Sequence, residues 1–346
     1  MKLFLNLLLL FVVISANGQS IEMSKILEEI DDQENLSGVV LVGQKGQIIY
    51  QNTYGFANQT TNTPNKIDTK FFIGSLTKQF TAVLVMQQLE AGKLELDSPI
   101  INYLPEFRED TGGKITIRHL LTHTHGIPNA ADGANISSLT KQEFESKYCH
   151  AELEFSPGTQ FKYSNINGYY LLGEILEQVS AKKFSQLLEE KILKPLNMTN
   201  TGVYNPKSSP NNLAMGSLQD EDNFSSAPPV DMSFSISAAG IFSTVEDLHN
   251  WDQAIRNEKL LSEDGFRQVF TPFNDSIRYG LGWYLNDPEI NGVKHLLAGH
   301  TGGASGFKSQ MMRGVHDDDV VVIFLSNSNK YVELRYPLMN VLLSTN

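Results

Sequence analysis

Cysteine is nearly absent from the sequence: Cys149 is the only one among 346 residues. One cysteine cannot close an intramolecular disulfide, so an apolar core has to stabilise the fold, and 41% hydrophobic residues suffice to form one. Positive charge is also scarce, because 27 lysines and arginines stand against 39 acidic residues, for a formal net charge of −12. This balance argues against nucleic acid and anionic membrane surfaces as partners.

Long apolar runs are missing too. The longest, residues 3–14, is shorter than the ~20 residues of a membrane-spanning helix, and Asn6 interrupts it. A lysine precedes this run and small residues follow it, which is typical of a secretory signal. We therefore expect residues 1–18 to be a signal peptide cleaved near Gly18. The mature chain, 19–346, would be periplasmic or extracellular, with no stable membrane anchor.

The order of sequence patterns predicts one α/β (α+β) domain whose sheet is built from both chain ends. Residues 36–43 and 47–54 are rich in β-branched and aromatic residues and flank a turn at Gly46, which predicts a hairpin. Helical spacing dominates from about 100 to 240, so an all-α lobe should be inserted there. Residues 205–235 lack periodicity and predict a long loop that shapes a pocket. Strand patterns return at 294–299, 306–312 and 319–326.

The pattern Ser-x-x-Lys occurs at four places: Ser75/Lys78, Ser138/Lys141, Ser180/Lys183 and Ser305/Lys308. On a helix this spacing puts both side chains on one face. A serine hydroxyl becomes a nucleophile only when a base takes its proton, and a lysine can be that base only when it is neutral. The pattern alone is weak, so the surroundings of each copy have to decide.

Ser75 stands out because it precedes FTAVLVM (80–86), which is apolar on nearly every face and predicts a buried helix start. Burial and the positive end of the helix dipole both disfavour the ammonium form of Lys78. Ser138 opens a polar segment and is most simply a helix-start residue. The alternative for Ser75 is an N-capping serine beside a solvent-reaching lysine, which a buried helix start does not favour.

Two further motifs follow in order: Tyr-Ser-Asn at 163–165, just before a helical pattern, and His-Thr-Gly at 300–302, after a strand pattern. With them the chain resembles the serine β-lactamase and penicillin-binding-protein superfamily, most closely the class C β-lactamase, D-Ala-D-Ala carboxypeptidase and esterase branch. The likeness runs from about residue 37 to the end. It implies a β-lactamase/transpeptidase-like fold with an antiparallel sheet flanked by helices. Similar flanking phrases are LLTHTHGIP, SPGT, SAAGIFST and YGLGWYL.

The resemblance also implies a catalytic group of three residues. Ser75 would be the acylated nucleophile, and Lys78 and Tyr163 would share the proton transfers. A tyrosine base needs a pKa lowered from about 10 by a nearby ammonium, whereas a lysine base must itself be neutral. The two roles compete, and the sequence leaves both open.

The substrate-binding residues are likewise implied by the resemblance. Asn165 would orient substrate, and His300 and Thr301 would line the opposite wall. The oxyanion of the tetrahedral intermediate would be stabilised by the backbone N–H groups of Ser75 and Gly303. Substrates of this chemistry are small molecules or peptides, including peptidoglycan fragments, D-amino-acid peptides, short esters and β-lactams, and no cofactor is expected.

His300 departs from the lysine found in most β-lactamases of this superfamily. An imidazole with a pKa near 6.5 is mostly neutral at pH 7, so a carboxylate-bearing substrate would lose a fixed positive partner. We hypothesise a peptidase or esterase more than an enzyme of antibiotic resistance. A protein that is acylated by penicillin and does not turn over is the main alternative.

Two other enzyme classes have less support. His119, His123 and His125 prompt a remote alternative, a metal-dependent hydrolase, because His119 and His123 are four residues apart and could share a helix face. No acidic cluster nearby completes such a site. A Ser-His-Asp hydrolase of the α/β type is disfavoured because the sequence contains no G-x-S-x-G nucleophile elbow.

Overall fold

The computed structural model describes residues 2–129, 140–220, 223–229, 231–315 and 318–344, with side chains from residue 18 onward. Its centre is a six-stranded antiparallel sheet with the order β10-β13-β14-β15-β1-β2. These strands are β1 (Gly38–Gln44), β2 (Gln47–Tyr54), β10 (Tyr284–Asn286), β13 (Leu297–Ala304), β14 (Phe307–Gly314) and β15 (Val320–Ser326).

The sheet joins the two ends of the chain, as the sequence predicted. β1 pairs with β15, with Leu41 opposite Ile323, and β1 and β2 form the expected hairpin. Alternate residues of these strands enter two different cores, because successive side chains point to opposite faces. Val39 and Leu41 belong to the core shared with the central helices, whereas Val40 packs on the other face with the first and last helices.

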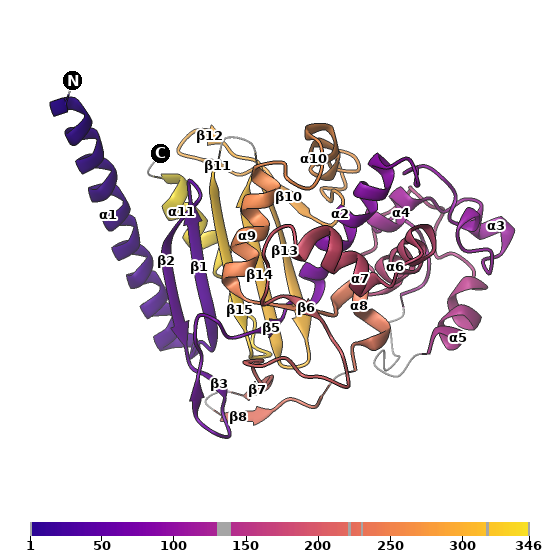
Figure 1. Cartoon of the computed structure of the whole chain (residues 1–346), viewed down its shortest axis with the longest axis horizontal. Coiled ribbons are helices and arrows are strands. Elements are labelled where there is room, and N and C mark those ends of the chain that lie inside the picture. The colour runs from indigo at the N-terminus through magenta and orange to yellow at the C-terminus, as the bar shows by residue number, and fades with distance from the viewer. Residues whose placement is uncertain (1, 130–139, 221–222, 230, 316–317, 345–346) are drawn as a thin grey trace.

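The helices lie on both sides of this sheet (Figure 1). α1 and α11 cover one face, α9 and α2 the other, and α3 to α7 form a lobe at the far side of α2. Their bounds are α1 (Lys2–Glu34), α2 (Thr77–Glu90), α3 (Glu109–Gly112), α4 (Ile117–Leu121), α5 (Lys141–Phe144), α6 (Asn167–Ser180), α7 (Phe184–Leu188), α8 (Ile236–Ala239), α9 (Val245–Arg256), α10 (Glu263–Val269) and α11 (Arg335–Ser344). Short 3₁₀ and π turns are η1 (Gly74–Leu76), η2 (Ile100–Asn102), η4 (Glu145–Cys149), η5 (Glu189–Leu193) and η6 (Ser233–Ser235).

The stretch 100–240 is helical only in part. After Met198 the chain leaves the helices and forms three short strands, so the prediction of an all-α lobe to residue 240 is wrong for its last third. β6 joins β5 and β9 in a small sheet, and β7 pairs with β8 within the loop expected at 205–235. The short strands are β3 (Phe56–Asn58), β4 (Thr63–Pro64), β5 (Phe71–Phe72), β6 (Gly202–Val203), β7 (Ser217–Asp220), β8 (Asn223–Ser226), β9 (Ile241–Ser243), β11 (Glu289–Ile290) and β12 (Val293–Lys294).

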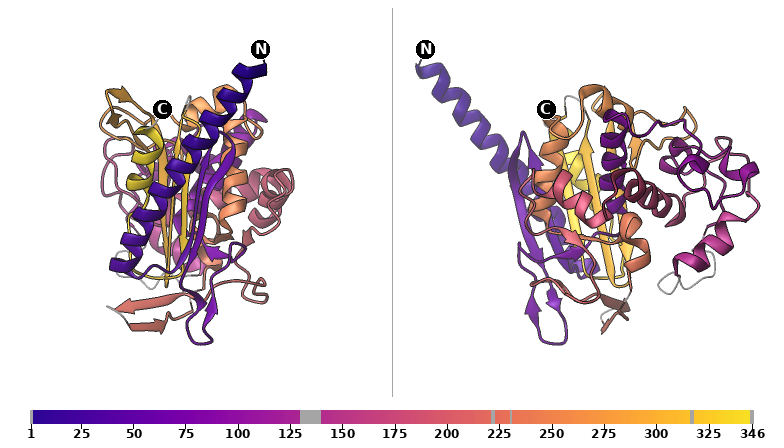
Figure 2. Two further views of the ribbon diagram at one scale, coloured as in Figure 1. Left: turned by 90° about the vertical axis from the view of Figure 1, so that its left-hand side faces the viewer. Right: turned by 45° about the vertical axis from the view of Figure 1, so that its right-hand side comes forward.

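α1 continues without a break through the cleavage position expected near Gly18. Its C-terminal half packs on the sheet through Met23 and Leu27, which are buried, whereas its N-terminal half extends beyond the sheet (Figure 2). Among the described residues, no helix is both long and apolar enough to cross a membrane.

Candidate active site

Ser75 lies on η1, which runs directly into α2. Gly74 has a φ of 51°, which glycine adopts without strain, and a side chain here would collide with the backbone of Gly303. The sequence predicted Ser75 and Lys78 in the first turn of one helix, and the structure places Ser75 in the 3₁₀ turn just before it. The two side chains nevertheless meet, with 3.0 Å between Ser75 Oγ and Lys78 Nζ.

Lys78 is completely buried and has three polar neighbours. Its Nζ lies 3.0 Å from Ser75 Oγ, 2.8 Å from the Asn165 carbonyl and 3.1 Å from the Ala238 carbonyl. An ammonium can donate to all three. A neutral amine donates to the two carbonyls and keeps its lone pair for the Ser75 hydroxyl proton. Burial lowers the pKa of Lys78 to about 7, so the neutral form is available near neutral pH.

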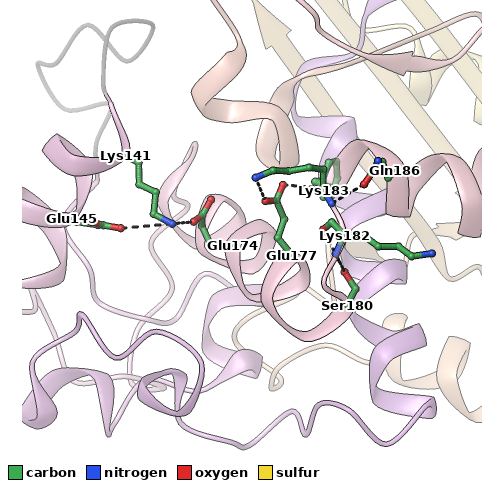
Figure 3. A network of polar contacts seen from close by, with 9 residues as sticks. Lys141, Glu145, Glu174, Glu177, Ser180, Lys182, Lys183 and Gln186 are labelled. Carbon is green, nitrogen blue, oxygen red and sulfur yellow. Dashed lines mark hydrogen bonds and ion pairs between the residues drawn. The ribbon is translucent and has the colours of Figure 1, made fainter.

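The other Ser-x-x-Lys copies on helices lack these surroundings (Figure 3). Lys183 lies 2.7 Å from the Glu177 carboxylate, and 77% of its side chain is exposed. Ala181 has a φ of 53° and ends α6 between that serine and that lysine, so the two do not share a helix face. Lys141 also pairs with glutamates, and Ser138 lies outside the described residues.

Tyr163 lies beside this pair. Its ring centroid is 5.4 Å from Lys78 Nζ, and its ring packs against His123 and Tyr284. Burial raises the pKa of Tyr163, and a hydrogen bond with the Ser75 hydroxyl opposes that shift only in part. The tyrosine therefore keeps its proton at neutral pH while Lys78 can lose one. These opposite shifts favour Lys78 as the base and Tyr163 as a proton donor.

The predicted oxyanion donors lie against one another. Gly303 is on β13, and its backbone nitrogen would be 2.5 Å from a side chain on Gly74, the residue before Ser75. Ser309 ties the same two segments together, because its hydroxyl donates to the Ile73 carbonyl at 2.7 Å. The backbone of Gly303 therefore lies next to the nucleophile, where an oxyanion would form.

His300 lies behind the site rather than on its surface. Its side chain is 1% exposed, and both ring nitrogens have protein partners: the Thr301 carbonyl at Nδ1 and the Tyr279 hydroxyl at Nε2. A carbonyl can only accept, so Nδ1 carries the proton and Nε2 accepts from Tyr279. Burial lowers the pKa of His300 to about 3, so the imidazole is neutral, as expected from the sequence, but it presents no ring nitrogen to substrate. Thr301 beside it is half-buried.

A cavity of about 400 Å³ opens at the nucleophile, and we call it the catalytic cavity. Ser75, Asn165 and Gly303 line it, as the resemblance implied. Two charged residues that sequence reasoning did not select, Lys308 and Asp231, also line it. The only signal for Lys308 was its place in the fourth Ser-x-x-Lys copy, to which the sequence analysis assigned no role.

Lys308 is positioned by strand pairing. It is opposite Gly303 across β13 and β14, and its Nζ lies 3.6 Å from the point where a side chain on Gly303 would begin. Among the described residues it has neither a hydrogen bond nor an ion pair with another side chain. A cation that lines a cavity and has no such partner can bind an anionic group of a substrate.

The three histidines of the metal alternative do not form a ligand set. In His119, His123 and His125 the Nδ1 atom accepts a hydrogen bond from a backbone N–H, which for His123 is that of Ser164. Within the described ranges, no three His, Cys, Asp or Glu side chains are grouped to hold a metal ion. His123 instead packs on the Tyr163 ring, with 4.4 Å between centroids, and helps to position that motif.

The chain is similar in sequence and in fold to known penicillin-binding proteins. Penicillin-binding protein 4* of Bacillus subtilis (strain 168) is 28% identical over 92% of this chain and 74% of its own length. Putative penicillin-binding protein PbpX of the same organism is 29% identical over 76% of this chain, and the match spans 65% of that relative. The crystal structure of a penicillin-binding protein from Bacillus halodurans superposes with a TM-score of 0.76 at 27% identity, covering 92% of this chain and 97% of that one.

The family itself is shown by a match over nearly the whole sequence. The family model described as Beta-lactamase matches residues 23–344. This range contains the Ser-x-x-Lys, Tyr-Ser-Asn and His-Thr-Gly motifs and all the strands of the central sheet. The chain therefore belongs to the Beta-lactamase family, and its site is of the serine hydrolase type.

Proposed function

We propose that this protein is an exported serine hydrolase that cleaves an amide or ester through an acyl-enzyme on Ser75. The observation that carries the proposal is the environment of Lys78. This buried amine has a pKa near 7 and donates hydrogen bonds to two carbonyls. In its neutral form its lone pair faces a serine hydroxyl 3.0 Å away. The proposal requires neither metal nor cofactor.

Acylation follows from the positions of these groups. Lys78 takes the proton of Ser75 Oγ, which attacks the substrate carbonyl. The oxyanion accepts hydrogen bonds from the backbone N–H groups of Ser75 and Gly303. When the tetrahedral intermediate collapses, the C–O or C–N bond to the leaving group breaks, and that group takes a proton from Tyr163. The Lys78 ammonium returns a proton to the phenolate, and water then repeats the sequence to release the acid.

The substrate class follows from the charges that line the catalytic cavity. The buried, neutral His300 supplies no positive charge to a substrate carboxylate. Lys308 nevertheless provides a cation on the same wall, so a substrate carboxylate keeps a partner there. Peptides that end in a D-amino acid, including peptidoglycan fragments, fit these charges, and short neutral esters fit the same catalytic centre.

A second candidate function is a penicillin-binding protein that is acylated and stays acylated. The names of the two Bacillus subtilis relatives favour it. The same three residues would carry out acylation, and only the rate of deacylation separates the two functions.

The experiment that tests both is intact mass against time for the protein mixed with a penicillin, alongside a Ser75→Ala control. A mass gain that requires Ser75 establishes the nucleophile. Decay of the added mass indicates a hydrolase, and its persistence indicates a penicillin-binding protein that stays acylated. The same comparison is made with p-nitrophenyl acetate and with a D-Ala-D-Ala peptide. Turnover of none of them, together with no mass gain, contradicts the proposal.

Export rests on the composition of residues 1–18. Cleavage near Gly18 would cut α1 and leave its sheet-packing half, with Met23 and Leu27, in the mature chain. The mass of the protein recovered from periplasm or medium tests this, because a cleaved chain lacks the first 18 residues. Recovery of only the full-length chain inside cells would contradict export.

A further inference from the structure

A second cavity, of about 300 Å³, lies at the other end of β14 from the catalytic cavity. Its walls come from α9, α10 and the end of β14, and we call it the arginine cavity after Arg256 and Arg313, which line it. Lys308 is near the start of β14 and Arg313 near its end, so the two residues are about 17 Å apart along the strand at a rise of ~3.4 Å per residue. None of the described residues lines both cavities.

The buried part of this lining is apolar except for one side chain. The buried apolar residues are Ile255, Phe266, Phe270 and Val315. The exception is Arg313, whose side chain is 3% exposed. A ligand that reaches the bottom of the arginine cavity therefore meets two aromatic rings, two aliphatic side chains and one guanidinium.

The guanidinium of Arg313 has donors to spare. Its Nε donates to the Asp252 carboxylate at 2.6 Å, and its Cζ lies 5.4 Å from the centroid of the Phe270 ring. Within the described ranges its two terminal nitrogens have no acceptor, and they are not enclosed by protein, so they face the cavity that Arg313 lines. Guanidinium donors without an acceptor cost free energy in a buried position, and a ligand oxygen would recover it.

A second guanidinium lies close to the first. Arg256 on α9 is half-buried, donates to the Gly314 and Asp318 carbonyls and pairs with Asp319 at 2.8 Å. Burial and the neighbouring Arg313 cation lower the pKa of Arg256, as expected where two cations lie close together. An anion placed beside them would weaken this repulsion.

The remaining charges limit which anion fits. Arg313 and Arg256 already have one carboxylate partner each, so the cavity would hold an anion through the terminal nitrogens of Arg313 and not through a large net charge. Glu258 and Glu263 also belong to the lining, but they are exposed, where water and salt screen them. A group with a single negative charge suits this balance better than a dianion.

From this arrangement we propose that the arginine cavity binds a small carboxylate with an apolar body. The carboxylate would accept parallel hydrogen bonds from the two terminal nitrogens of Arg313, a geometry that matches a planar guanidinium. The body would pack against Phe266 and Phe270. A cavity of about 300 Å³ is at the small end of ligand sites, which fits one aromatic ring with a short chain. This site is separate from the proposed chemistry at Ser75.

The test is isothermal titration calorimetry of the protein with 3-phenylpropanoate. Two analogues separate the contributions, because 3-phenylpropanamide keeps the ring without the charge and propanoate keeps the charge without the ring. We expect 3-phenylpropanoate to bind with a Kd of about 1 mM or tighter, and each analogue to bind about tenfold more weakly. Equal binding of acid and amide, or no measurable binding of the acid, overturns the inference.

Two substitutions check the position of the ligand. Arg313→Lys keeps a cation beside Asp252 but loses the fork of donors, so binding should weaken about tenfold. Thr271→Trp changes an exposed residue of the lining, should narrow the cavity and should weaken binding about fivefold. If Arg313→Lys does not fold, Thr271→Trp decides alone. The matched control is Thr61→Trp, in the exposed turn between β3 and β4, which should leave the Kd within about twofold. Unchanged binding by Thr271→Trp and by folded Arg313→Lys overturns the inference.

The catalytic cavity also offers a cation to a carboxylate, so Lys308→Gln is titrated as well. This variant should leave the Kd for 3-phenylpropanoate within about twofold, because Lys308 lines only the catalytic cavity. Binding that Lys308→Gln abolishes and Thr271→Trp leaves intact would assign the carboxylate to the catalytic cavity and overturn the inference. These titrations need no turnover, so their result stands whether or not Ser75 is acylated.

Discussion

Ser75/Lys78 and Ser180/Lys183 share one sequence spacing and have opposite chemistry. Burial lowers the pKa of Lys78 to about 7, whereas the Glu177 carboxylate raises the pKa of the exposed Lys183. The first serine precedes a central helix packed on every side. The second is the last residue of α6, in a turn that is not buried, and its lysine pairs with the Glu177 carboxylate (Figure 3). The difference teaches that a two-residue motif becomes a catalytic centre only where the fold removes water and competing charges.

Removing the base should have the largest effect. Lys78→Ala should lower the Ser75 acylation rate about 10³-fold, because general base catalysis contributes about 10²–10⁴-fold. The rate is measured by intact mass with an ester or penicillin, and circular dichroism checks that the fold is kept. Acylation at the wild-type rate by a folded Lys78→Ala protein would show that another group takes the proton.

The pH profile should sharpen the same comparison. The base must be neutral, so kcat/KM for a neutral ester should rise with pH through about 7 and level off above it. Below that value activity should fall about tenfold per pH unit, as Lys78 becomes protonated. An ascending limb centred near pH 10 would mean that Lys78 resembles the exposed lysines and that its burial has no catalytic role.

A smaller effect is expected at Lys308, which lines the catalytic cavity but, unlike Lys78, is not buried. Lys308→Gln should lower kcat/KM about tenfold for a carboxylate-bearing substrate and leave a neutral ester within about twofold. Lys308→Arg keeps the charge and should restore most of the preference. Equal losses on both substrates would indicate that Lys308 supports the strand and not the substrate.

The smallest effect is expected at the second copy of the motif. Lys183→Ala should leave the acylation rate within about twofold and change the free energy of unfolding by less than about 0.5 kcal/mol, because an exposed ion pair contributes little. Chemical denaturation and intact mass measure the two quantities. A large loss of activity would contradict the view that surroundings, and not the spacing itself, create the site.

Much of the fold could be predicted because local sequence patterns indicate its elements. Two stretches of β-branched residues around Gly46 predicted the hairpin of β1 and β2, and the uninterrupted apolar run 80–86 predicted a buried helix. The end of the helical lobe could not be predicted. β6 has only two residues and forms because β9 lies beside it, and a strand that short has no periodicity to detect.

The candidate site, like the fold, could be predicted from the sequence only in part. Ordered motifs were enough to select Ser75 and Lys78 and to predict that His300 is neutral. They did not reveal that His300 is buried behind Thr301, since exposure depends on what packs against a strand. They also could not identify the Ala238 carbonyl, because a backbone acceptor has no residue type to mark it.

By itself, the sequence determined the order of elements, the apolar faces and the spacing of the nucleophile and its base, since these depend on neighbours along the chain. Only the tertiary structure decided how far the pKa of Lys78 falls, and that Lys308 lines the catalytic cavity beside Gly303. A pKa depends on the water and dipoles within a few ångströms of the group. At Lys78 those dipoles come from residues 87 and 160 positions away along the chain.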